Sequence, residues 1–108
     1  MLPKKERLSR LEFSRFFSMG KRYHSPFFTI VHTPFEVLHV SVVVSKKISN
    51  RAVMRNKIRR RIYDIVRHYR TEQKVGGVFI FLTKKGVEKA SYNSLKSEVY
   101  AQLNTLHP

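Results

Sequence analysis

Residues 50–70 read NRAVMRNKIRRRIYDIVRHYR, and this basic stretch decides how the rest of the chain is organised. On a helical wheel its apolar side chains fall into one stripe that covers about a third of the circumference. The stripe consists of Met54, Ile58, Ile62, Ile65, Val66 and Tyr69. The pattern predicts an amphipathic helix that begins near Ser49 or Asn50, ends near Tyr69 and packs its stripe on a β-sheet.

Two apolar segments that flank this helix supply the strands of the predicted sheet. Residues 37–45, VLHVSVVVS, alternate so that one face carries only Leu38, Val40, Val42 and Val44. Residues 78–82, VFIFL, form a continuous apolar run that is typical of a buried strand. Strand, helix and strand in this order predict a parallel pair of strands joined by the basic helix.

The remaining elements complete an α+β domain. A helix over residues 9–19 is indicated by the capping box of Ser9 and Glu12 and by Gly20 after its end. Further elements are expected as a short edge strand over 21–25, a strand over 27–33 and a last helix over 92–106. The sequence thus predicts one domain over residues 1–108, an α-β sandwich of order α-β-β-(β)-α-β-α with helices on a central mixed sheet.

Composition excludes several classes of protein and favours a polyanionic partner. Twenty-two Lys and Arg oppose seven Asp and Glu, for a formal net charge of +15, and there is no cysteine. The missing cysteine excludes disulfides, thiolate zinc sites and iron–sulfur clusters. No apolar run reaches the length of a membrane span and no signal peptide is recognisable, so we expect a cytoplasmic protein that does not contact membranes. So large a positive excess repels itself unless a polyanion binds to it.

The charge pattern of the basic helix favours nucleic acid over a merely solvated surface. Between Lys46 and Arg70 there are ten Lys or Arg and one acid, Asp64. Ordinary exposed helix faces alternate charges at a spacing of four residues, whereas here like charges repeat at that spacing. Cations also crowd the helix N-terminus, where the helix dipole disfavours them by about 0.3–1 kcal/mol. An external phosphate would relieve both penalties.

Residues 44–62, VSKKISNRAVMRNKIRRRI, resemble the protein subunit of bacterial ribonuclease P. That family carries a Lys-Lys pair after a strand and then a helix with an Arg-Asn-Arg-x-Lys-Arg-x-x-Arg signature. Matching or charge-preserving residues are Lys46, Lys47, Arg55, Asn56, Lys57, Arg59 and Arg60. Tyr63 departs from the final arginine, for which Arg61 is a nearby substitute. The resemblance extends to residues 7–20 and 77–99.

The resemblance implies a function and an uncommon topology. The family's subunit binds a catalytic RNA that, with Mg²⁺, removes the 5′ leader of precursor tRNA. It implies a 1:1 complex with that RNA, with a dimer of the holoenzyme left open. It also implies a left-handed β–α–β crossover, against the usual right-handed rule. No catalytic residue, metal site or cofactor is expected on the protein, since the Mg²⁺ belongs to the RNA.

The basic face and the signature together predict the RNA-binding residues. They are Lys46, Lys47, Arg51, Arg55, Asn56, Lys57, Arg59, Arg60, Arg61 and Arg67. The resemblance further implies a cleft for the single-stranded leader between the sheet, the first helix and the basic helix. Its predicted residues are Phe13, Phe17, Phe28 and Val31, since single strands are held by aromatic stacking beside positive charge. Val31 stands where the family often has a tyrosine.

Three alternatives are weighed against this prediction. A protein-only nuclease would need clustered carboxylates or a histidine pair, and no acids are suitably spaced. His32 and His39 are expected on neighbouring strands, where they could form a metal pair, although structural or surface roles are favoured for both. A ribosomal RNA-binding protein has the same composition but no need of the signature. A membrane-surface helix would direct the apolar stripe toward lipid, although the flanking strands need that stripe for their core.

Overall fold

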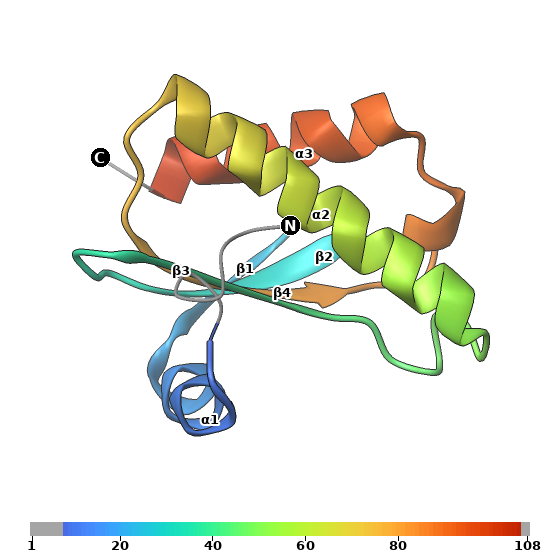
Figure 1. Cartoon of the computed structure of the whole chain (residues 1–108), viewed down its shortest axis with the longest axis horizontal. Helices are drawn as coiled ribbons and strands as arrows, with labels where there is room; N and C mark the ends of the chain where they lie inside the picture. Colours follow the sequence, from blue (N-terminus) through green and yellow to red (C-terminus); the bar gives the residue numbers. More distant parts are fainter. Residues whose placement is uncertain (1–7, 107–108) are drawn as a thin grey trace.

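The computed structural model describes residues 8–106, which form one four-stranded sheet with helices on both faces. The elements are α1 (Arg10–Met19), β1 (Lys21–His24), β2 (Phe28–Thr33), β3 (Leu38–Val43), α2 (Ala52–Glu72), β4 (Gly77–Thr83), the 3₁₀ turn η2 (Val87–Lys89) and α3 (Tyr92–Leu106). Helices α2 and α3 cover one face of the sheet, and α1 lies against the other (Figure 1). No helix among these residues is both long and apolar enough to cross a membrane.

The order of the strands confirms the predicted mixed sheet. The strands lie side by side as β1-β2-β4-β3; β1 and β4 pair antiparallel with β2, and β3 pairs parallel with β4. Helix α2 connects the parallel pair, as the sequence predicts, while the left-handed crossover stays a prediction from the resemblance. The last helix has the predicted bounds, the other elements differ from their predicted bounds by a few residues, and η2 was not predicted.

The larger core lies between the sheet and the helices α2 and α3. Along β4 the side chains alternate, so Phe79 and Phe81 enter this core and Val78 and Ile80 point to the α1 face. The predicted stripe of α2 is confirmed by the fully buried Ile58, Ile62, Ile65, Val66 and Tyr69. Met54, at the N-terminal margin of the stripe, is only half-buried.

A smaller core attaches α1 to the opposite face through Phe16, Val31, Val78 and Ile80. The capping box is confirmed, because the Ser9 and Glu12 side chains each accept a hydrogen bond from the other's backbone N–H. The chain then turns directly into β1 at Gly20. A Cβ at that position would lie 2.5 Å from Cγ1 of Val31, so only glycine allows this close approach of helix and sheet.

The start of α2 differs from the prediction. The helix begins at Ala52, and its N-cap is Arg51, whose side chain makes no capping hydrogen bond. The Ser49 hydroxyl instead accepts a hydrogen bond from the Arg51 N–H, two residues away. Ser49 therefore stabilises the turn before the helix, and the prediction of Ser49 or Asn50 as the cap is wrong.

Tyr63 also differs, since the predicted apolar stripe did not include it. It is 7% exposed and belongs to the larger core. Its hydroxyl accepts a hydrogen bond of 3.2 Å from the N–H of Val42 in β3. Because β3 is an edge strand, half of its N–H groups face away from β4, and Tyr63 satisfies one of them. The tyrosine thus fastens α2 to the sheet edge.

We predict that Tyr63→Phe lowers the free energy of unfolding by about 1–3 kcal/mol, because the buried Val42 N–H loses its acceptor. Urea unfolding followed by circular dichroism measures this. The matched control is Tyr23→Phe in β1, whose hydroxyl makes no hydrogen bond within residues 8–106; it should change stability by less than about 0.5 kcal/mol. Equal effects of the two variants would contradict this role of Tyr63.

Candidate nucleic-acid interface

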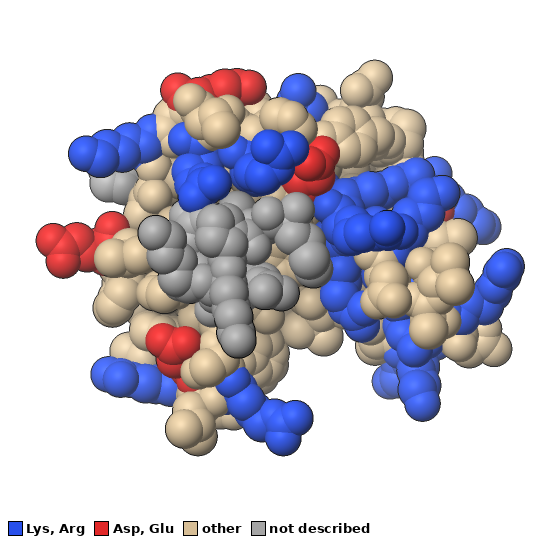
Figure 2. Space-filling view, viewed as in Figure 1, with Lys and Arg blue, Asp and Glu red and all other residues tan. Residues whose placement is uncertain are grey.

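The cations of α2 and of the loop before it gather at one end of the molecule. Figure 2 shows Lys and Arg atoms concentrated on the right-hand side, over the N-terminal half of α2 and its preceding loop. Among the predicted contacts, six are exposed: Lys46, Lys47, Arg51, Asn56, Lys57 and Arg60. Arg67 forms an ion pair with Asp64. Within residues 8–106, Lys46, Lys47, Arg51, Lys57, Arg60 and Arg61 form no ion pair, so these cations are available to an external anion.

The loop that leads into α2 is held by a hydrogen bond from an arginine of the helix itself. Arg55 is half-buried, and its Nη1 donates a hydrogen bond of 3.0 Å to the Ser49 carbonyl. The first turn of α2 has neither an acidic residue nor a side-chain cap. Its N–H groups are thus free to bind a phosphate, while Arg55 shapes the loop that presents them.

A pocket of about 490 Å³ opens beside this first turn, lined by Val53, Asn56, Arg59 and Arg60. Nη1 of Arg59 donates to Oδ1 of Asn56, so the amide of Asn56 keeps its NH₂ group as the remaining donor. Val53 is 73% exposed and gives the pocket one apolar side chain. A wall of hydrogen-bond donors beside one apolar side chain suits a phosphate with its ribose.

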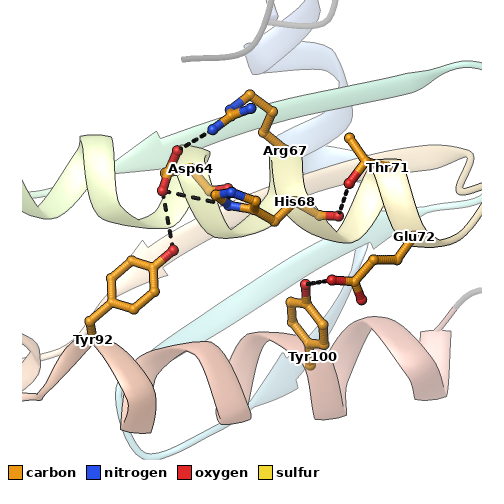
Figure 3. A network of polar contacts seen from close by, with 7 residues as sticks. All are labelled: Asp64, Arg67, His68, Thr71, Glu72, Tyr92 and Tyr100. Atoms are coloured by element: carbon orange, nitrogen blue, oxygen red, sulfur yellow. Dashed lines mark hydrogen bonds and ion pairs between the residues drawn. The ribbon is translucent and has the colours of Figure 1, made fainter.

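Asp64 receives two hydrogen bonds and thereby neutralises part of the predicted site. Nη2 of Arg67 donates to Oδ1 at 2.8 Å, and the Tyr92 hydroxyl of α3 donates to Oδ2 at 3.1 Å (Figure 3). The hydrogen bond from Arg67 is the main cause that lowers the pKa of Asp64, which is therefore ionised at neutral pH. Of the ten predicted RNA contacts, Arg67 is the one whose charge is already balanced.

On the opposite face, α1 carries an aromatic pair beside a cation. The rings of Phe13 and Phe17 stack with centroids 5.5 Å apart and planes 20° apart. The guanidinium of Arg22 in β1 lies 4.9 Å from the Phe17 ring centroid. Both rings are half-buried, so each keeps some accessible surface. This arrangement can receive an unpaired base next to a phosphate.

The two other predicted cleft residues, Val31 and Phe28, are buried and offer no surface on which a base could stack. Val31 lies on the α1 face, but it is 1% exposed beneath the helix. Phe28 has no exposed surface and belongs to the core under α2 and α3, so its assignment to the cleft is wrong. Positions 28 and 31 have opposite parity along one strand, and their side chains therefore point to opposite faces.

The histidine pair of the nuclease alternative is not formed. The expectation that His32 and His39 lie on neighbouring strands is wrong, because β4 is inserted between β2 and β3. His32 stacks on Phe79 in the larger core, and burial lowers its pKa, so its ring is neutral at neutral pH. His39 lies opposite Val78 on the other face and contacts Phe35. Within the described residues no three His, Asp or Glu side chains are grouped to hold a metal.

Two residues of the candidate interface, Arg22 and Tyr92, were not predicted from the sequence. Strict alternation over the edge strand would have placed Arg22 on the face opposite Tyr23, and so beside the first helix. No local pattern points from Tyr92 to Asp64, because 28 residues and a whole strand separate them.

Comparisons with known proteins agree with this architecture. A family model described as Ribonuclease P matches residues 2–107. The ribonuclease P protein component of Geotalea uraniireducens is 32% identical over 108 residues, covering 97% of this chain and 94% of the relative. That of Streptococcus agalactiae is 36% identical over 93 residues, covering 82% and 81%.

Solved structures show the same fold at low identity. The ribonuclease P protein from Thermotoga maritima superposes with a TM-score of 0.83 at 20% identity, covering 95% of this chain and 99% of that one. The Staphylococcus aureus protein gives 0.80 at 18%, covering 93% and 94%.

We predict that Arg60→Ala weakens binding to a structured RNA and reduces the slope of log K against log salt by about 0.7–0.9, the value for one lost phosphate contact. Arg67→Ala, the matched control on the same helix, should change the slope less, since Asp64 already offsets its charge. Filter binding over a series of salt concentrations measures both slopes. Equal slopes for the two variants would contradict the assignment.

Proposed function

The chain belongs to the ribonuclease P protein family, whose members take part in tRNA processing, and we propose that it is the protein subunit of a bacterial ribonuclease P holoenzyme. In this proposal it binds the catalytic RNA in a 1:1 complex in the cytoplasm and also holds the 5′ leader of precursor tRNA. The holoenzyme removes the leader by hydrolysis and so generates the mature 5′ end.

One observation supports this proposal above the others: α2 is fixed to the sheet by fully buried side chains, while three cations on its outer side form no ion pair within the described residues. Ile58, Ile62 and Ile65 have no exposed surface. On the outer side Lys57, Arg60 and Arg61 make no ion pair within residues 8–106. A rigid surface of fixed cations is what a folded RNA with fixed phosphates can dock against, because neither partner must become ordered on binding.

The leader is assigned to the α1 face. Phe17 with Arg22 offers stacking and positive charge together, which holds a single strand with little preference for its sequence. The two RNA surfaces then lie on different sides of the sheet, so catalytic RNA and leader do not compete for the same residues. Holding the leader raises the affinity for precursor over mature tRNA.

Catalysis in this proposal is the work of the RNA subunit and its Mg²⁺ ions. The protein supplies neither a catalytic residue nor a cofactor. Its contribution is electrostatic, since cations near both RNAs reduce the repulsion between catalyst and substrate and lower the concentration of Mg²⁺ that the reaction requires. A ribosomal protein would share the basic helix, but the match to the ribonuclease P family model over residues 2–107 favours the subunit.

We predict that the purified protein, freed of RNA, does not cleave precursor tRNA, and that cleavage appears when a bacterial ribonuclease P RNA is added at a low Mg²⁺ concentration. The RNA alone at the same Mg²⁺ concentration is the control and should be much slower. Gel analysis of 5′-labelled precursor measures the cleavage. Robust cleavage by the protein alone would overturn the proposed function.

We predict further that Phe17→Leu weakens the binding of precursor tRNA to the reconstituted holoenzyme by about 1–3 kcal/mol, because one stacking surface is lost. Binding of mature tRNA should not change. Phe16→Leu on the same helix is the control: Phe16 is 7% exposed, so its loss should reduce stability without distinguishing the two tRNAs. Equal losses for precursor and mature tRNA in Phe17→Leu would assign that ring to the core alone.

A further inference from the structure

The junction of α2 and α3 carries a second pocket, separate from the one at the helix start. It measures about 400 Å³ and is lined by Lys57, Arg60, Arg61, Asp64 and Tyr92. This volume lies within the range of about 300–1,000 Å³ that is typical of ligand pockets. Three of the lining residues are cations of α2, and the tyrosine is the first residue of α3. The pocket therefore combines a positive wall with an aromatic ring.

The three cations share one side of α2. Lys57, Arg60 and Arg61 stand at positions i, i+3 and i+4, which places them on neighbouring turns of one helix face. Three like charges at this spacing repel one another, and no acid within residues 8–106 forms an ion pair with any of them. A phosphate bound between the three side chains would offset their mutual repulsion and accept hydrogen bonds from them.

Asp64 is the only acid that lines the pocket among the described residues, and its charge does not oppose a phosphate. Its Oδ1 is paired with Arg67 at 2.8 Å, which balances the carboxylate from outside the pocket. Its Oδ2 accepts the hydrogen bond from the Tyr92 hydroxyl, so the carboxylate fixes the ring (Figure 3). Burial raises the pKa of Tyr92, so the hydroxyl stays protonated and keeps donating. Asp64 is thus a positioning residue for the ring.

The ring of Tyr92 can meet a base without losing its anchorage. It is half-buried and packs partly against the core under α2 and α3, while the same residue lines the pocket. Aromatic rings held in this way stack on unpaired bases, at roughly 1–3 kcal/mol per base. Positive charge and ring lie in one pocket, and a nucleotide carries a phosphate and a base on one sugar.

We propose that this pocket binds one unpaired nucleotide of RNA, with its phosphate on Lys57, Arg60 and Arg61 and its base stacked on Tyr92. The inference rests on the proposed function, because the RNA that it concerns is the catalytic RNA. Arg60 lines this pocket and the pocket of Val53, Asn56 and Arg59 at the helix start. The RNA backbone therefore follows α2 from its N-terminus to the junction with α3.

The chain contains no tryptophan, which gives the test a clean optical signal. Tyr92→Trp introduces a single indole into the pocket, and stacking of a base quenches its fluorescence. We expect quenching when a bacterial ribonuclease P RNA is added. The matched control is Tyr100→Trp, two turns further along α3, where the tyrosine does not line the pocket, its hydroxyl donates to Glu72 and Lys96 lies over its ring. Its emission should stay constant over the same titration.

Affinity measurements separate stacking from a purely structural role. Tyr92→Leu should weaken RNA binding about 5- to 100-fold, while Tyr92→Phe, which keeps the ring and loses only the hydrogen bond that orients it, should weaken binding clearly less. Thermal unfolding of both variants verifies that they are folded. Equal losses of affinity in the two variants would mean that the hydrogen bond to Asp64 matters and the ring does not, which would overturn the proposal.

The outcomes also distinguish this inference from the proposed function. RNA that binds with full affinity while the indole at position 92 is not quenched overturns the nucleotide pocket and leaves the ribonuclease P assignment intact. If the wild-type protein does not bind the RNA at all, the proposed function fails and the inference fails with it. Quenching in both tryptophan variants would indicate non-specific coating of α3 by RNA and would also overturn the pocket.

Discussion

The contact between the apolar stripe of α2 and the sheet is the interaction on which the rest of the molecule depends. Each fully buried aliphatic side chain contributes about 1.5–3 kcal/mol, and four of them lie in this stripe: Ile58, Ile62, Ile65 and Val66. Repulsion between like charges at a spacing of four residues costs only a few tenths of a kcal/mol per pair. The free energy gained by burial therefore exceeds the cost of charge repulsion. A helix that would be unstable in isolation is held rigidly on the sheet with its positive charges exposed.

Four acids among the described residues accept hydrogen bonds from the protein's own N–H and hydroxyl groups. Glu12 caps α1, Glu88 accepts from the Gly86 N–H, and Asp64 and Glu72 accept from tyrosines of α3. Asp64 and Glu72 are eight residues apart in α2, as their partners Tyr92 and Tyr100 are in α3, so one repeat of hydrogen bonds joins the two helices. Only Asp64 also forms an ion pair with an arginine within the described residues. The large positive charge is consequently free to face outward.

Most of the fold could be predicted from the sequence because its signals are local and periodic. The stripe of α2, the alternation of β3 and the capping box of α1 each depend on residues a few positions apart, and all three are confirmed. The burial of Tyr63 was not predicted, because its hydroxyl bonds a backbone N–H that is available only since β3 is an edge strand. No local pattern reveals which strand lies at the edge. Phe28, by contrast, could have been assigned correctly, since its parity relative to Val31 excludes a shared face. Of the site, the cations follow from composition and spacing, whereas the pairing of Asp64 with Tyr92 requires the tertiary structure.

The position of β4 in the middle of the sheet constrains how the molecule is made. Within the described sheet β3 has no neighbour other than β4, and β2 reaches β3 only through it. A growing chain therefore releases β3 and the whole of α2 before the strand that unites them, and at ~5–20 residues per second the delay is on the order of seconds. During that interval the apolar side of α2 lacks the Phe79 and Phe81 side chains of β4 that it packs with in the finished core. The sheet can therefore form only after Gly77–Thr83 has been synthesised, because this strand joins β2 to β3. A chain that ends before β4 would keep the basic residues of α2 but could not form the core that holds the helix.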